Sequence, residues 1–109
     1  MPKKVIYVAE STYRMIKLCS VGKTHDEVLR RAVDKLAEGG VGVIVDYDRS
    51  DELKYRVEVS SETHYLLSRL KVELDCRSYD ELIFDMMVNY LASLGMSDAC
   101  IREILELEV

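Results

Sequence analysis

A basic residue followed by a hydroxyl residue occurs twice in the chain, each time at the predicted start of a helix. Lys23 precedes Thr24, and Arg77 precedes Ser78. Each hydroxyl can cap a helix, and the free amides and positive dipole end of a helix N-terminus attract anions. A simple cap is the usual role of such a residue. A basic residue directly before the cap in both cases favours a phosphate contact in addition to capping.

Other reactive residue types are present without the spacing that chemistry needs. His25 and His64 are not spaced with the cysteines as metal ligands. The three cysteines have no paired spacing and are expected to be small hydrophobic side chains in a reducing compartment: Cys19, Cys76 and Cys100. No nucleophile with a neighbouring base, glycine-rich phosphate loop or catalytic carboxylate pair can be placed. We therefore expect neither an enzyme nor a metal or cofactor.

The elements that would position Arg77 and Ser78 follow from residues 54–91. Polar and apolar residues alternate first, as in a half-buried strand, with Tyr55, Val57 and Val59 on one side and Lys54, Arg56, Glu58 and Ser60 on the other. Helical spacing follows Ser60, a good N-cap, in Tyr65 or Leu66, Leu67, Leu70 and Leu74. A second helix begins with a capping box at Ser78 and Glu81. Its predicted buried stripe is Leu82, Ile83, Met86, Met87, Tyr90 and Leu91.

The N-terminal half repeats this strand-helix-helix unit. Residues 5–8 predict a strand, and Tyr13, Ile16 and Cys19, or Met15 and Leu18, predict a helix face. The second helices align as KTHDEVL (23–29) against RSYDELI (77–83). The offset is 51 residues at the strand, where Thr12 matches Thr63, and 54 at the second helix. The difference predicts three extra residues in the inter-helix turn of the second copy.

We therefore predict two tandem copies, at residues 3–38 and 54–94. The linker, residues 39–53, contains Gly39 and Gly40, which end a helix, and a possible extra strand at 41–47. A C-terminal amphipathic helix is predicted at 97–108, capped by Ser97 with an apolar side of Ile101, Ile104, Leu105 and Leu107. The predicted fold class is mainly α with a short antiparallel β-ribbon. Each copy must pair with another, because a lone strand leaves its backbone groups open; pairing within one chain and exchange between chains both remain possible.

The alternating strand, the S-S-E-T helix start at 60–63 and the S-x-D-E-L-I start at 78–83 resemble the ribbon-helix-helix family of DNA-binding regulators, the MetJ/Arc type. The tandem form is similar to regulators of hyperthermophilic archaeal filamentous viruses. The resemblance implies a transcription regulator, such as a repressor, whose two-stranded ribbon enters the major groove of double-stranded operator DNA. Because the two copies differ, one ribbon would read an asymmetric half-site, and a palindromic operator would require two chains, so we expect a homo-oligomer.

The resemblance assigns candidate DNA contacts. The ribbon face turned away from the helices would read bases through Lys3, Val5, Tyr7, Lys54, Arg56 and Glu58. Arg56 suits guanine, Glu58 can accept from a cytosine amino group, and Val5 can meet a thymine methyl. The family usually has polar residues here, so Val5 and Tyr7 depart from its pattern. Phosphate contacts are expected from Lys4, Lys23, Thr24, Arg77 and Ser78.

Charge keeps other interpretations open. The net charge is −5, although residues 1–50 carry nine bases against seven acids and residues 51–109 six against thirteen. The run 5–8 fits a strand buried on both faces, with a one-residue slip burying Val5 and Tyr7, and Arg56 and Glu58 fit a solvated cross-strand ion pair. The alternative functions are a toxin-binding antitoxin of the same fold and a protein-interaction module that has lost its DNA face.

The expected environment is the cytoplasm, of a host cell if the source is a virus. The first apolar run, residues 5–8, is too short for a signal peptide, and no stretch approaches a membrane span. The absence of Gln and the single Asn89 hint at a thermophile.

Overall fold

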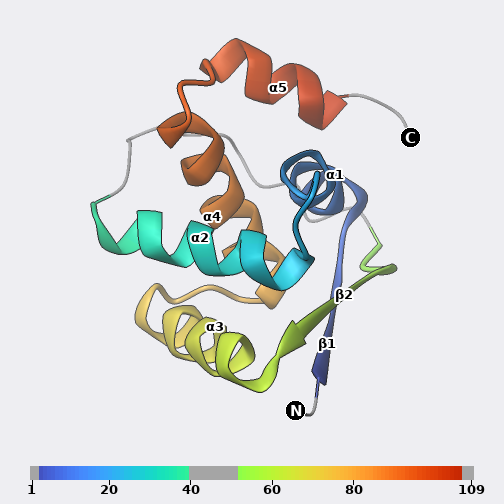
Figure 1. The fold of residues 1–109 in the computed structure, drawn as a ribbon, viewed down its shortest axis with the longest axis vertical. Helices are drawn as coiled ribbons and strands as arrows, with labels where there is room; N and C mark the ends of the chain where they lie inside the picture. Colours follow the sequence, from blue (N-terminus) through green and yellow to red (C-terminus); the bar gives the residue numbers. More distant parts are fainter. Residues whose placement is uncertain (1–2, 40–51, 107–109) are drawn as a thin grey trace.

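The computed structural model describes residues 3–39 and 52–106. Its elements in chain order are β1 (Lys3–Val8), α1 (Glu10–Cys19), α2 (His25–Ala37), β2 (Tyr55–Ser60), α3 (Ser61–Glu73), α4 (Tyr79–Ser93) and α5 (Asp98–Glu106). The helices lie on one side of a two-stranded antiparallel sheet (Figure 1), which confirms a mainly α fold with a short β-ribbon. The possible strand at 41–47 lies outside the described residues.

The ribbon forms within the chain. β1 pairs antiparallel with β2 in a register that sets Lys3 opposite Ser60 and Val8 opposite Tyr55. At its centre Ile6 lies opposite Val57, and these are two residues that the repeat alignment equates. The register therefore relates the two strands by an approximate exchange about this central pair. The pairing satisfies the backbone groups that a lone strand would leave open.

The inner face of the ribbon packs against the helices. Ile6, Val8, Val57 and Val59 are buried there, as the alternation predicts. Val5 and Tyr7 keep 37% and 54% of their surface exposed, which rules out the one-residue slip that would bury them.

Helix α4 is the centre of the core, and it contacts α1, α2, α3, α5 and β1. Every residue of its predicted stripe is buried. Phe84 and Val88 are buried as well, because neighbours cover α4 on several sides and a helix that is apolar all round is a central one.

Two aspartates tie the halves of the chain together. The Asp80 Oδ1 on α4 accepts from the Ala9 backbone N–H after β1, at 2.8 Å. The Asp26 Oδ1 on α2 accepts from the Ser60 backbone N–H at the end of β2, also at 2.8 Å. The repeat alignment equates these aspartates, as it does Ala9 and Ser60. Each second helix is therefore fixed to the strand of the other half, and the two halves share one core.

The predicted site of the three-residue insertion is wrong. The turns between the helices and the next caps are equally long, at residues 20–23 and 74–77, whereas α1 has 10 residues and α3 has 13. The insertion therefore lengthens α3 by most of a helical turn. Each turn needs one residue with a left-handed backbone, which is Gly22 (φ 72°) in the first and Asp75 (φ 53°) in the second.

The apolar face predicted for α3 needs a related correction. Leu67 is buried and Leu70 packs against the core, and of the two alternatives Leu66 is partly buried whereas Tyr65 is 61% exposed. Leu74 is 50% exposed. Leu74 is the C-cap residue of the lengthened helix and no longer faces the core. Helical spacing alone extended the stripe one turn too far.

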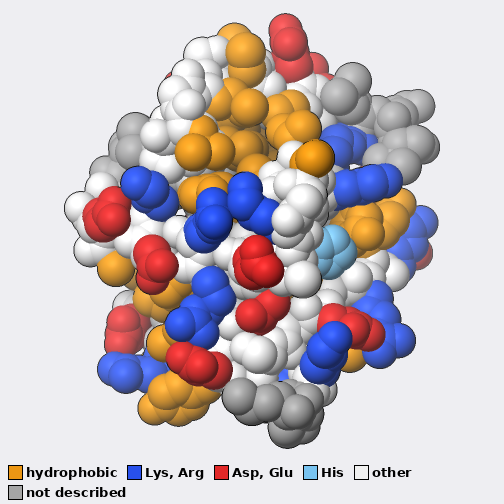
Figure 2. Space-filling model, viewed as in Figure 1, with side chains coloured by type: hydrophobic (Ala, Val, Ile, Leu, Met, Phe, Trp, Pro, Cys, Tyr) orange, Lys and Arg blue, Asp and Glu red, His pale blue; other side chains and the backbone are white. Residues whose placement is uncertain are grey.

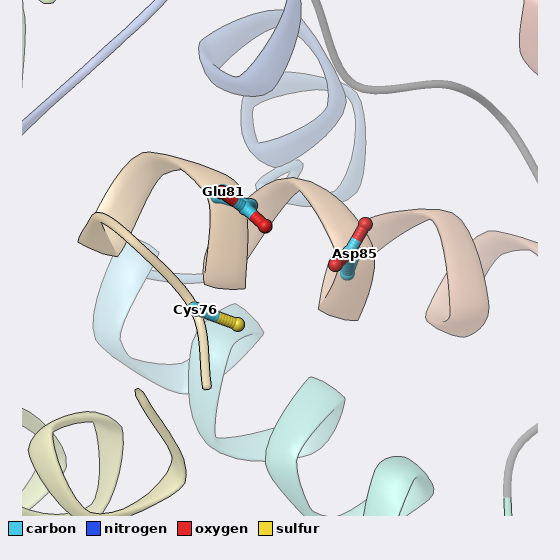
Figure 3. Close-up of side chains that lie close together, drawn as sticks. All are labelled: Cys76, Glu81 and Asp85. Atoms are coloured by element: carbon cyan, nitrogen blue, oxygen red, sulfur yellow. The ribbon is translucent and has the colours of Figure 1, made fainter. Parts of the chain in front are cut away.

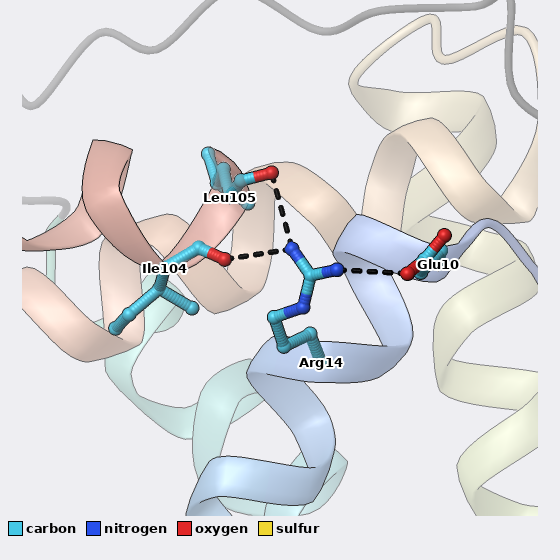
Figure 4. Close-up of polar contacts among 4 residues, drawn as sticks. All are labelled: Glu10, Arg14, Ile104 and Leu105. Carbon is cyan, nitrogen blue, oxygen red and sulfur yellow. Dashed lines mark hydrogen bonds and ion pairs between the residues drawn. The ribbon is translucent and has the colours of Figure 1, made fainter. Parts of the chain in front are cut away.

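Helix α5 covers the outer side of α1. Ser97 caps it as predicted, with its Oγ accepting from the Cys100 N–H at 3.3 Å, and Ile101 is fully buried. The Arg14 guanidinium donates to the Ile104 and Leu105 carbonyls at 2.8 and 3.2 Å (Figure 4). A cation at a helix C-terminus satisfies the last carbonyls and the dipole, so α5 is anchored to its own core.

The surface carries both signs of charge. Figure 2 shows hydrophobic side chains gathered between α5 and α2, and below them Lys, Arg, Asp and Glu side chains interspersed. Among the described residues no helix has the length and apolar character needed to cross a membrane.

Candidate functional site

The outer face of the ribbon exposes five of the six predicted base-contacting residues on the paired strands: Lys3, Val5, Tyr7, Arg56 and Glu58. Val5 lies opposite Glu58, and Tyr7 lies opposite Arg56. Lys54 is exposed but precedes β2, at the end of the ribbon away from Lys3. Lys4, a predicted phosphate contact, is exposed opposite Val59.

Glu58 is the electrostatic centre of this face. Its carboxylate lies 3.1 Å from the Arg56 guanidinium and 3.8 Å from the Lys3 ammonium. The predicted Arg56–Glu58 pair exists, but both residues are on β2, and the cross-strand partner is Lys3. Because the side chains are half-exposed or more, each pair contributes little to stability. The three charges together leave the face with one net positive charge.

A hollow of about 460 Å³ joins one end of the ribbon to the N-terminus of α2. Its lining is Lys3, Lys23, Thr24, His25, Asp26, Glu58, Val59 and Ser60. The Thr24 Oγ1 accepts from the Glu27 N–H at 3.2 Å and so caps α2 as predicted. The structure thus brings Lys23 and Thr24, predicted from one motif, beside Lys3 and Glu58, predicted from another.

Asp26 is one of the lining residues for which the sequence predicts no DNA contact, together with His25, Val59 and Ser60. Burial raises the pKa of Asp26. Hydrogen bonds from the Ser60 backbone and from the Thr63 and Ser60 hydroxyls, together with the Arg30 charge, lower this pKa by more than burial raises it. The net pKa is below the ordinary value, so the carboxylate stays ionised. The only sign of this hydrogen-bonding role in the sequence is that an aspartate, Asp26 or Asp80, stands at the same position in both aligned helix starts.

The N-terminus of α4 has a different setting. The Ser78 Oγ accepts from the Glu81 N–H at 3.1 Å, so the predicted cap is confirmed, and Arg77 is exposed. Beside it, Glu81 and Asp85 lie on one side of α4 with Cys76 in the preceding turn (Figure 3). Desolvation and then the Glu81 charge raise the pKa of Asp85. The first turn of each second helix carries two acids. Asp85 adds a further acid near the start of α4, whereas Lys3, Lys23 and Glu58 lie together at the start of α2.

The same three side chains are the one metal-capable group among the described residues. The Cys76 sulfur and one oxygen each of Glu81 and Asp85 lie within 4.8 Å of one another. Desolvation first, then the charges of Asp85 and Glu81, raise the pKa of the Cys76 thiol, which disfavours the thiolate that binds metals. Structural zinc sites use four ligands, mostly Cys and His. We assign no metal to this group.

Both histidines pack against a tyrosine. The Tyr13 ring lies 5.7 Å from His25, and the His64 ring lies 5.3 Å from Tyr79. The alignment equates Tyr13 with His64 and His25 with Tyr79, so the same contact between the two helices of each half is made with the partners exchanged. This contact gives both histidines a packing role.

Comparisons of the chain with protein-family models, with curated proteins and with solved structures return no match.

Proposed function

We propose that this protein is a sequence-specific, double-stranded DNA-binding transcription regulator of the ribbon-helix-helix kind, with two units in one chain. The observation that carries the proposal is the exposed outer face of an intramolecular two-stranded ribbon, next to a capped helix start flanked by lysines. A two-stranded ribbon fits the major groove. A helix N-terminus beside it meets the phosphates at the groove edge.

The side chains of the face suit direct readout. Arg56 can donate two hydrogen bonds to guanine, Glu58 can accept from cytosine, and Tyr7 and Val5 offer apolar contact to a thymine methyl. Lys23 and Thr24 lie where a phosphate would be held beside Lys3. The Arg77 and Ser78 end is the weaker phosphate holder, because the acids Glu81 and Asp85 lie near it. One chain would therefore bind an asymmetric half-site, and a palindromic operator would need a homo-oligomer.

A mobility-shift assay on duplexes selected from a random library tests the proposal. We expect wild-type protein to select a defined sequence and to lose affinity steeply as salt rises. Arg56→Ala should reduce specific affinity about tenfold or more, as expected for a bidentate base contact worth ~1–3 kcal/mol. Lys3→Ala should weaken binding to all duplexes.

Matched controls exist for both variants. Arg69 is as exposed as Arg56 (61% and 60%) and also pairs with a glutamate, but on α3. Lys35 pairs with Glu38 on α2 and is the control for Lys3. Arg69→Ala and Lys35→Ala should bind like wild type. Selective binding that survives both Arg56→Ala and Lys3→Ala would show that the ribbon face is not the reader.

One observation favours a second candidate, a ribbon that binds protein. Tyr7 is 54% exposed on the outer face, and Glu58 pairs with both cations beside it, which suits an interface core ringed by polar groups. Salt-insensitive capture of a protein partner, lost in Tyr7→Ala and without any duplex binding, would support this candidate instead.

A further inference from the structure

Asp26 connects the two kinds of contact in the proposed interface. Its backbone is the second residue of α2, directly after the capped start that bears Lys23 and Thr24. Its Oδ1 accepts from the N–H of Ser60, the last residue of β2. Ser60 in turn lies opposite Lys3 in the ribbon. One side chain thus joins the phosphate-facing helix start to the base-facing strand.

We propose that Asp26 is a positioning residue, which sets the spacing between the groups that hold phosphate and the groups that read bases. The inference rests on the proposed DNA-binding function. Sequence readout requires phosphate and base contacts to be made at the same time, in one register. Non-specific binding requires only positive charge near phosphates. A displaced α2 should therefore reduce discrimination between sequences more than it reduces general affinity.

The geometry assigns this role to Asp26 rather than to Asp80. Asp80 makes the equivalent bond to Ala9, but it is 1% exposed, and the acids Glu81 and Asp85 lie near the helix start that it fixes. Asp26 lines the solvent-open hollow with Lys3 and Lys23. The hydrogen bond from strand to second helix and the favourable phosphate site therefore occur together at the start of α2 and not at the start of α4.

Two substitutions separate the position of the carboxylate from its charge. Asp26→Asn keeps an oxygen that can accept from Ser60 but removes the charge. Asp26→Glu keeps the charge but moves the acceptor by one carbon–carbon bond. Asp34→Asn, on the exposed side of the same helix, controls for charge removal alone.

Fluorescence anisotropy gives the dissociation constants for the selected duplex and for a scrambled duplex. The quantity compared is the dissociation constant of the scrambled duplex divided by that of the selected duplex, which measures discrimination. The ratio cancels any loss of folded protein, so a purely structural role would not change it. We expect Asp26→Glu to lower the ratio about tenfold, the size of one charge-assisted hydrogen bond. Asp26→Asn and Asp34→Asn should keep the wild-type ratio.

The outcomes distinguish this inference from the proposed function. Wild-type protein that binds neither duplex at low salt would overturn the proposed function. If the wild-type protein discriminates between the duplexes and Asp26→Glu has the same ratio, the positioning role alone is overturned. The positioning role is also overturned if Asp26→Asn loses as much discrimination as Asp26→Glu. If Asp26→Glu is unfolded at the assay temperature, Asp26→Ser, whose shorter side chain withdraws the acceptor, takes its place with the same expected loss.

Discussion

Under the proposed function, the charge of Glu58 would restrain the affinity of the ribbon face for DNA. It pairs with Arg56 on its own strand and Lys3 across the ribbon. In the free protein it holds both cations in place. Under the proposed DNA binding its charge would repel phosphates, so only a sequence that offers a hydrogen-bond donor to Glu58 would compensate for it.

Glu58→Gln should therefore raise affinity for scrambled DNA and lower the specific to non-specific ratio. The slope of log affinity against log salt should steepen by about one, because one more phosphate is neutralised by the freed cations. Titrations from low to moderate salt measure both. Glu73→Gln, which frees Arg69 on α3, should leave slope and ratio unchanged.

Asp85 is exposed on α4, but partial desolvation and the neighbouring Glu81 disfavour its ionised form in the folded state. Desolvation and Glu81 raise its pKa above the ordinary value of 3.8, so the folded state disfavours the ionised carboxylate at neutral pH. The penalty disappears as pH falls through the raised pKa. We expect Asp85→Asn to raise the melting temperature at pH 7 and to lose this advantage as pH falls toward 3.8. Thermal melts across that range check it; a gain that persists at the lowest pH, or that Asp34→Asn reproduces, would contradict it.

At the scale of elements, the two halves differ at the start of their first helices. Ser60 caps α3, accepts from the Thr63 N–H at 3.1 Å and contacts the Thr63 hydroxyl at 3.0 Å. The equivalent cap of α1 is Ala9, which has no side-chain hydrogen bond. The equivalent hydroxyl, Thr12 Oγ1, is buried without a hydrogen-bond partner among the described residues. One missing oxygen thus accounts for both deficits.

Ala9→Ser should supply the missing cap and a partner for Thr12. We expect about 1 kcal/mol of added stability, the usual contribution of an N-cap hydroxyl. Chemical denaturation measures the change. The gain from Ala9→Ser should be smaller when Thr12 is replaced by Val. Ala37→Ser, at the exposed end of α2, should give no gain. An equal gain in stability from Ala9→Ser alone, from Ala9→Ser with Thr12→Val and from Ala37→Ser would contradict the explanation.

Arg14 attaches α5 to α1 through the Ile104 and Leu105 carbonyls and also pairs with Glu10 at 2.9 Å. Arg14→Ala should loosen α5 and cost about 1–3 kcal/mol, the range for hydrogen bonds to a charged group. Hydrogen exchange should rise across residues 98–106 and not in β1 or β2. Arg31→Ala, at an exposed position on α2, is the control. Equal loss of protection in the ribbon would show that α5 is not a separable element.

For the whole molecule, the shared core makes the two halves one cooperative unit. The Asp26 and Asp80 bonds span 34 and 71 residues of sequence, and α2 packs against α4. We expect a single unfolding transition with equal calorimetric and van't Hoff enthalpies. Because the strands pair within one chain, the melting temperature should not depend on protein concentration. A rise with concentration in scanning calorimetry would indicate association between chains, by strand exchange or as a homo-oligomer of folded chains.

Local chemistry allowed much of this architecture to be predicted from the sequence. The change from alternation to helical spacing, the caps at Thr24, Ser60 and Ser78, and the exposed outer side of the ribbon each depend on residues that are neighbours in the chain. The repeat also identified which residues are equivalent. These features need no knowledge of distant contacts.

Only the tertiary structure decided the remaining features. The three inserted residues could enter a turn or a helix, and packing placed them in α3. Asp26 and Asp80 stand at helix starts in the sequence, but their Oδ1 atoms accept from N–H groups of the opposite half. The hollow at the start of α2 exists because the ribbon brings Lys3 and Glu58 beside Lys23. Such contacts join residues far apart in the sequence, so no local pattern records them.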